Sequence, residues 1–119
     1  MKRENLDRKV DLAFLLAFYG GMLTEKQRQI VTLHCEEDLS LGEIAEEIGI
    51  SRQSVHDTLT RAAARLEEME AALGTARRFQ RMQSGLSEAL ASLRQQDYAG
   101  AEEILSRLQR QEEEESNGL

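Results

Sequence analysis

The stretch LGEIAEEIGISRQSVHDTLTR, residues 41–61, decides the fold of this chain. Its apolar residues have helical spacing on both sides of Gly49, and Ala45 stands four residues before that glycine. Two helices that cross at a wide angle need a small residue where their backbones approach, and the tight turn needs a residue that tolerates a left-handed backbone. Ala45 and Gly49 meet these needs, so the stretch predicts a helix-turn-helix. Four apolar residues are expected inside it: Ile44, Ile48, Ile50 and Val55.

The second helix of this motif should turn a row of polar side chains to solvent. The N-terminal end of such a helix enters the major groove of DNA. Gln53 can make paired hydrogen bonds to adenine, while Arg52 or Arg61 can bind guanine edges or phosphate. Asp57 repels phosphate unless it accepts from a cytosine amine or pairs with Arg61. The predicted nucleic-acid-binding residues are Ser51, Arg52, Gln53, Ser54, His56, Thr60 and Arg61.

Capping patterns and apolar stripes predict two more helices before the motif and a long continuation of its second helix. Thr24 and Ser40 each have the capping-box form, with Gln or Glu three residues later. Apolar stripes predict amphipathic helices over about 6–18, 25–36 and 51–73. The expected fold class is therefore all-α, a bundle of four helices that forms one domain over residues 1–73.

The C-terminal third predicts a helical extension over 74–110. Apolar stripes at 86–93 and 101–108 indicate a helical hairpin. Its apolar face is too narrow to form a core alone, so the hairpin is expected to dock on the first four helices or on another chain. Four consecutive Glu residues fall within 111–119, and this acidic tail is predicted to be frayed or disordered.

The distribution of charge limits how tightly one subunit can bind nucleic acid. The chain of 119 residues has a net charge of −7, which argues against a surface that is basic throughout. Residues 51–65 sum to +2, whereas residues 36–47 carry six acidic side chains and no basic one. We expect weak, salt-sensitive binding by one subunit, and a homodimer whose two recognition helices, about 34 Å apart, strengthen it.

A second cationic cluster consists of Arg77, Arg78 and Arg81, interleaved with Phe79. Arginine and an aromatic ring can stack on exposed RNA bases, which would make the cluster a nucleic-acid contact. Alternatively, it is a charged helix face that pairs with acidic residues such as Glu70, with Phe79 turned inward. The charged helix face is the favoured interpretation.

No pattern in the chain indicates catalysis or a cofactor. The sequence has neither a glycine-rich nucleotide-binding stretch nor a plausible nucleophile, base and acid set, so a non-enzyme without cofactor is expected. His34 lies beside Cys35, but without further ligands at metal spacing no metal site is expected, and Cys35 is interpreted as a small buried or half-buried hydrophobe. One cysteine and no long apolar run favour a reduced, cytoplasmic protein.

Two sets of segments resemble known families. Residues 40–66, SLGEIAEEIGISRQSVHDTLTRAAARL, resemble the promoter-reading helix-turn-helix of bacterial sigma factors. FYGGMLTEKQ (18–27), CEEDLSLGEIAEE (35–47) and SRQSVHDTLTR (51–61) resemble, in this order and spacing, the YlxM family of small bacterial proteins. This resemblance covers about residues 5–75. It implies an all-α, sigma-factor-like helix-turn-helix fold without a wing.

The family resemblance also implies a functional context. Members of the YlxM family are linked to the signal recognition particle pathway, so the resemblance implies an accessory or regulatory role there, with DNA or the particle's RNA as ligand. One alternative is an adaptor whose helix-turn-helix is only a scaffold. Its acidic segment 36–47, with Glu43, Glu46 and Glu47, or its C-terminal hairpin would then bind a basic partner such as a GTPase component of the particle. Another is a sequence-specific transcription regulator. The side chains of the motif serve DNA and RNA backbones alike.

Overall fold

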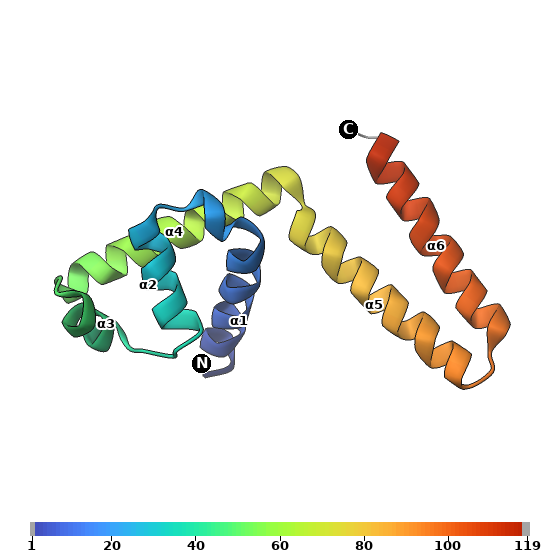
Figure 1. The fold of residues 1–119 in the computed structure, drawn as a ribbon, viewed down its shortest axis with the longest axis horizontal. Helices are drawn as coiled ribbons and strands as arrows, with labels where there is room; N and C mark the ends of the chain where they lie inside the picture. Colours follow the sequence, from blue (N-terminus) through green and yellow to red (C-terminus); the bar gives the residue numbers. More distant parts are fainter. Residues whose placement is uncertain (1, 118–119) are drawn as a thin grey trace. The chain divides into compact units, whose positions relative to one another are not determined.

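Every element of the chain is helical, which confirms the predicted all-α fold (Figure 1). The computed structural model describes the backbone of residues 2–117 and the side chains of residues 8–116. Within that part, the elements in chain order are α1 (Lys2–Tyr19), the 3-10 turn η1 (Gly20–Met22), α2 (Glu25–Cys35), α3 (Leu41–Ile48), α4 (Arg52–Leu73), α5 (Thr75–Arg94) and α6 (Tyr98–Asn117).

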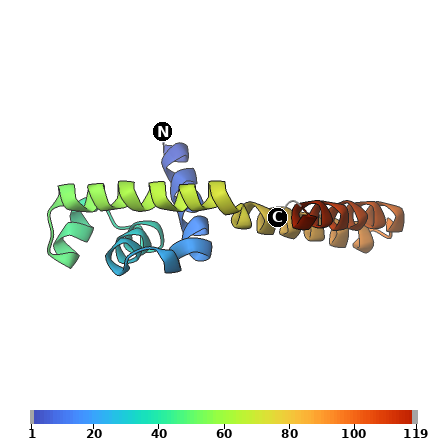
Figure 2. The ribbon, with the colours of Figure 1, turned by 90° about the horizontal axis from the view of Figure 1, so that it is seen from above.

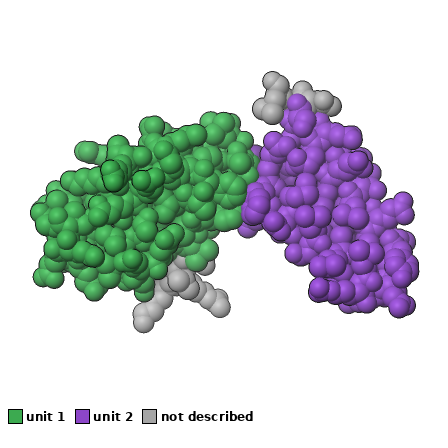
Figure 3. All heavy atoms as spheres, in the orientation of Figure 1, with its two compact units in different colours: residues 1–76 green, residues 77–119 purple. Residues whose placement is uncertain are grey.

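The chain forms two compact units, residues 1–76 and residues 77–119 (Figure 3). The first unit contains α1 to α4 and the first two residues of α5. The second unit contains the rest of α5 together with α6.

Both predicted capping boxes are present. The backbone N–H of Gln27 donates to Thr24 Oγ1 at 3.1 Å, and the backbone N–H of Thr24 donates to Gln27 Oε1 at 3.1 Å. Ser40 and Glu43 make the equivalent pair of bonds, at 3.1 and 3.0 Å. Each box satisfies backbone donors that the first turn of a helix leaves without partners, which explains why α2 and α3 begin where the sequence predicts.

The core of the first unit consists of two neighbouring clusters. One joins α1, α2 and α4 through side chains such as Leu16, Val31 and Leu66. The other joins α2, α3 and α4 through Ile30, Leu33, Ile44 and Val55. Figure 2 shows α2 and α3 on the same side of α4. Both α2 and α4 contribute to the two clusters, and α4 contacts each of the other three helices of the unit.

A part-buried hydrogen-bond network lies at the break between α4 and α5. Gly74 ends α4 with a left-handed backbone, at φ +63°. Tyr19 Oη donates to Glu70 Oε1 at 2.6 Å and accepts from the backbone N–H of Thr75 at 3.1 Å. The backbone N–H of Ala76 donates to the same Glu70 oxygen at 3.0 Å. Side chains of α1 and α4 thus satisfy the first backbone donors of α5, an arrangement that no sequence pattern predicted.

In the second unit, α5 and α6 form a close antiparallel hairpin (Figure 1). Gly85 faces Leu108, and a Cβ atom added at Gly85 would lie 2.5 Å from Leu108 Cδ2. The turn uses Gln96 at φ +62°, and Asp97 Oδ1 then accepts from the backbone N–H of Gly100 at 3.0 Å. The predicted hairpin is confirmed, and its helices extend beyond the apolar stripes that indicated it.

The prediction of a frayed or disordered tail from residue 111 is wrong over the residues that the structure describes. Helix α6 continues to Asn117, while residues 118–119 lie outside the described part. The physical reason is a set of ion pairs between the two helices of the hairpin. Arg78 binds Glu112 at 2.7 Å and Glu115 at 2.5 Å, and Arg81 also binds Glu115.

These ion pairs also bear on the Arg77–Arg81 cluster. Arg78 and Arg81 form a charged helix face, as favoured above, and they bind Glu112 and Glu115 of α6. Phe79 is 46% exposed and is not turned inward. The acidic run and the basic cluster therefore stabilise one another within the hairpin.

Candidate nucleic-acid interface

The turn between α3 and α4 has the geometry that the sequence requires. Gly49 ends α3 at φ +81°, a left-handed conformation that costs a glycine little. The carbonyl oxygen of Ala45 accepts from the N–H of Gly49 at 2.9 Å and from the N–H of Ile50 at 3.2 Å. Ile44 and Val55 are fully buried on either side of the turn. The geometry fixes α4 against α3 and leaves the polar row of α4 outside.

The seven predicted binding residues are all exposed, and they all lie at the N-terminal end of α4. Two of them form its cap. Ser51 Oγ accepts from the backbone N–H of Ser54 at 3.0 Å and donates to Ser54 Oγ at 2.9 Å. The Ser51 hydroxyl is therefore occupied, whereas the Ser54 hydroxyl keeps its proton available for an external acceptor such as a phosphate oxygen.

Asp57 has a different partner from the one predicted. The Gln53 side-chain amide donates to Asp57 Oδ1 at 3.0 Å, and His56 Nδ1 lies 3.7 Å from the same oxygen. Within the described residues no ion pair joins Asp57 to Arg61. Gln53 precedes Asp57 by one helical turn, which places the two side chains within hydrogen-bond distance. An adenine contact by Gln53 has to compete with this hydrogen bond.

Thr60 differs from the two serines. Its hydroxyl donates to the backbone carbonyl oxygen of His56 at 2.9 Å, four residues earlier in α4. This bond uses the only proton of the hydroxyl and leaves an oxygen that can accept but not donate. Thr60 in this conformation is therefore not a donor to phosphate.

The two arginines are the charged groups of the row that remain available. Arg52 and Arg61 are exposed, and no ion pair to either is present in the described part of the chain. A guanidinium group that does not have to leave a carboxylate can bind phosphate or guanine with all its donors. Arg52 and Arg61 are thus the best-placed ligands for a nucleic acid.

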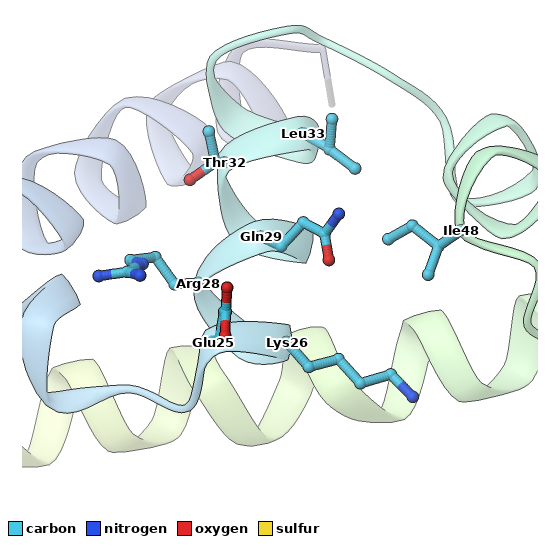
Figure 4. A pocket seen from close by; sticks show the side chains of 7 residues that line it. All are labelled: Glu25, Lys26, Arg28, Gln29, Thr32, Leu33 and Ile48. Atoms are coloured by element: carbon cyan, nitrogen blue, oxygen red, sulfur yellow. The ribbon is translucent and has the colours of Figure 1, made fainter.

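Two cations on the neighbouring helix α2, Lys26 and Arg28, were not predicted as binding residues from the sequence. A hollow of about 720 Å³ between α2 and α3 is lined by Glu25, Lys26, Arg28, Gln29, Thr32, Leu33 and Ile48. Figure 4 shows Lys26 directed toward the side of Ile48 and Arg28 directed the opposite way. Lys26 and Arg28 form no recognisable binding pattern in the sequence. Their position beside the helix-turn-helix is evident only from the structure.

The acidic residues predicted to bind a protein partner are not equivalent. The Glu43 carboxylate accepts from the backbone N–H of Ser40, and this hydrogen bond lowers the pKa of Glu43. Asp38, in the same acidic segment, binds Lys9 at 2.6 Å, which lowers the pKa of Asp38. Glu46 and Glu47 are exposed and have no ion pair within the described residues. Of the three predicted carboxylates, Glu46 and Glu47 are therefore available for a basic partner without loss of a helix cap.

His34 and Cys35 have structural surroundings. Burial lowers the pKa of His34, and its Nδ1 atom lies 3.3 Å from the carbonyl oxygen of Leu39. Cys35 is half-buried against the first core cluster, as predicted, and burial raises the pKa of its thiol. Among the described residues, no three His, Cys, Asp or Glu side chains are grouped closely enough to hold a metal ion.

The fold and the site define a helix-turn-helix protein. The model of the UPF0122 family, described as "Putative helix-turn-helix protein, YlxM / p13 like", matches residues 6–114, and the chain belongs to this family. The match continues through the α5–α6 hairpin, whereas the resemblance found in the sequence ended near residue 75. The hairpin is therefore a family feature. No helix in the described part of the chain is both long and apolar enough to cross a membrane.

Several bacterial proteins of the same family are similar to this chain. A UPF0122 protein of Acetivibrio thermocellus is 37% identical over 113 residues, which cover 92% of this chain and 97% of that protein. One of Halalkalibacterium halodurans is 38% identical over 104 residues, covering 87% and 94% respectively. One of Shouchella clausii is 43% identical over 83 residues, covering 70% and 76%.

Proposed function

We propose that this protein binds nucleic acid, through the exposed N-terminal part of α4 and as a homodimer. The observation that carries the proposal is the pair Arg52 and Arg61 on the helix that follows the left-handed Gly49. Both guanidinium groups are exposed, and neither forms an ion pair with a residue that the structure describes. Three further predicted binding residues, Gln53, Ser54 and His56, lie at the same exposed end of the helix, and Ser51 caps it. Thr60 is retained as an acceptor only.

Binding by a single subunit should be weak and sensitive to salt. The net charge of −7 and the carboxylates of residues 36–47 oppose the approach of a polyanion. Two arginines and Lys26 can neutralise only a few phosphates. Binding therefore releases few counterions, and this release contributes little to the affinity. A homodimer with two recognition helices compensates for this weakness through effective concentration.

We further propose a cytoplasmic accessory or regulatory role in the signal recognition particle pathway. Membership of the family, together with the role that the YlxM resemblance implies, supports this context. The particle's RNA and duplex DNA are both candidate ligands. A preference for one DNA sequence would instead favour the alternative of a transcription regulator.

The proposal is tested by fluorescence anisotropy with a labelled DNA pool and with the particle's RNA, at about 50 and 200 mM salt. The variant Arg52→Ala/Gln53→Ala is compared with Arg94→Ala/Gln95→Ala, which removes the same two residue types from an exposed site in α5 and its turn. We expect the first variant to lose at least about tenfold in affinity, because a bidentate contact contributes about 1–3 kcal/mol. The control should bind like the unchanged protein.

The outcomes separate the candidate functions. Equal binding by the folded Arg52→Ala/Gln53→Ala variant would contradict α4 as the interface. Absence of binding to both probes at micromolar protein would favour the adaptor function, in which Glu46 and Glu47 bind a basic GTPase component. For that function, charge reversal at Glu46 and Glu47 should abolish a nuclease-resistant pull-down, while Glu43 is left intact because it caps α3.

A further inference from the structure

The α5–α6 hairpin has two unlike sides. One side is a hollow of about 570 Å³ whose lining includes Met82, Leu86, Leu93, Tyr98 and Leu105. The other is a hollow of about 270 Å³ whose lining is mostly polar: Arg81, Ser84, Gly85, Glu88, Arg107, Leu108 and Gln111. On the polar side Arg107 also binds Glu88, at 3.5 Å. Most side chains of the polar side can hydrogen-bond to water, whereas most of those that line the apolar side cannot.

The apolar side leaves large side chains in contact with solvent. The exposed fractions are 45% for Leu86, 47% for Leu90, 43% for Leu93, 66% for Tyr98 and 43% for Leu105. If a large side chain offers about 200 Å², these residues and Phe79 together expose on the order of 500 Å² of apolar surface. That patch is at the upper end for a monomer, and with a polar rim it approaches the 800 Å² or so per partner of a stable interface.

The interior of the hairpin is too small to stabilise two helices of 20 residues each. Among the described residues of this unit, only Ala89, Ala101 and Leu108 are buried apolar side chains. A unit of this size needs a larger core, a disulfide, a metal or association with another chain. A partner that covers the apolar side would give the hairpin a larger core.

The spacing of apolar residues on α5 and α6 indicates how a partner packs on the apolar side. On α5 the residues Phe79, Met82, Leu86, Ala89 and Leu93 follow steps of three, four, three and four. On α6 the residues Tyr98, Ala101, Leu105 and Leu108 follow steps of three, four and three. This is the spacing of helices that pack as a left-handed bundle. In a hairpin of two helices only part of each stripe is covered.

The occupant must be apolar and must supply two helices. Glu102 is the only charged residue that lines the apolar hollow, so neither a nucleic acid nor a strongly charged protein fits it. A four-helix bundle requires two further helices of similar length with the same spacing. A second copy of the α5–α6 hairpin supplies both, in an isologous contact of this surface with itself.

We propose that this protein forms a homodimer through the apolar side of its α5–α6 hairpin, which pairs with the same surface of a second copy as a four-helix bundle. This interface is that of the homodimer in the proposed function. The proposal rests on that homodimer alone and not on nucleic-acid binding. Self-association is measured without nucleic acid, so either proposal can fail while the other stands.

Sedimentation velocity of the full chain tests the interface. At about 10 µM the unchanged protein should sediment with twice the 13.5 kDa monomer mass. Leu86→Glu and Leu105→Glu should each give monomers, because each places two charges in the apolar centre of the dimer. Ser84→Glu adds the same charge on the polar side of α5 and should remain a dimer. Circular dichroism checks that every variant keeps its helix content.

A milder variant and a second readout apply if the glutamate variants do not fold. Leu86→Ala/Leu105→Ala removes apolar contact without a buried charge and should raise the dimer dissociation constant at least about tenfold. Acrylamide quenching should report mainly Tyr98, because Tyr19 is 3% exposed, and it should fall as protein concentration rises. A wild-type monomer up to about 100 µM, or a dimer unaffected by all three variants, would overturn the proposal.

Discussion

The two units of this protein bury very different amounts of apolar surface. In residues 1–76, eleven apolar side chains are buried among those described, and they include Ile30, Val31, Ile44, Val55 and Leu66 with essentially no exposure. Among the described residues of 77–119, only three apolar side chains are buried, and two of them are alanines. The first unit has a core that suffices for an independent domain. The second consists of helices whose packing is unfinished.

The difference shows that helix formation and core formation are separate properties of a sequence. Both units consist of strong helix formers, and both have amphipathic stripes. In the first unit, four helices enclose their stripes from several directions. In the second, two helices cover only one edge of each stripe, and the ion pairs of Arg78 and Arg81 hold the ends together at the surface. These pairs join half-buried side chains near the surface, where ion pairs contribute little stability compared with a core.

The largest expected effect tests the core of the first unit. Ile44→Ala should lower the free energy of unfolding by about 3 kcal/mol, because it leaves a cavity between α2, α3 and α4. Urea unfolding followed by tyrosine fluorescence in a Tyr98→Phe background measures this, with Tyr19 as the reporter of the first unit. Leu73→Ala, at a side chain that is 56% exposed, is the control and should cost less than about 1 kcal/mol. Equal losses in both variants would contradict the assignment of the core.

An intermediate effect distinguishes the tight hairpin from an open helix surface. Gly85→Ala should lower stability by about 1–2 kcal/mol, since the new methyl group would force Leu108 to move. Gly42→Ala in α3 is the matched change, because the nearest atom to its Cβ is Ser40 Oγ at 4.0 Å. It should instead raise stability by about 0.5–1 kcal/mol through helix propensity. Thermal melting of the two variants compares them, and stabilisation by both would refute close packing in the hairpin.

The smallest expected effect is the pH dependence of the first unit near neutrality. Burial lowers the pKa of His34 below its ordinary 6.5, so the unfolded chain takes up a proton at higher pH than the folded chain. Stability should therefore fall as pH decreases from about 7 to 5, before the carboxylates titrate. Urea unfolding at several pH values measures the slope, and His34→Gln should flatten it. An unchanged slope in that variant would assign the dependence to another group.

The elements of the chain were predictable because their signals are local. Two capping boxes, the Ala45 and Gly49 pair and the apolar stripes gave all the helices of the first unit and the existence of the hairpin. The acidic run was misjudged for an equally local reason. A stretch of glutamates predicts disorder when it is considered alone, and its partners Arg78 and Arg81 lie 34 residues away.

The candidate site was predictable in its position but not in its hydrogen bonds. The motif placed seven polar residues on one exposed end of α4, and all of them are there. Which of their donors remain free depends on side-chain conformation. Thr60 bonds to the backbone and Gln53 bonds to Asp57, so the arginines are left as the charged groups available for a ligand.

The all-α class, the helix-turn-helix and the helix caps follow from the amino-acid sequence, because each depends on residues within a few positions of one another. The contacts that join distant segments follow from the three-dimensional fold. Tyr19 and Glu70 bind the start of α5, the acidic end of α6 pairs with the arginines of α5, and one side of the hairpin keeps its leucines exposed. Such contacts depend on where the backbone places two separate segments, and that placement is not present in either segment alone.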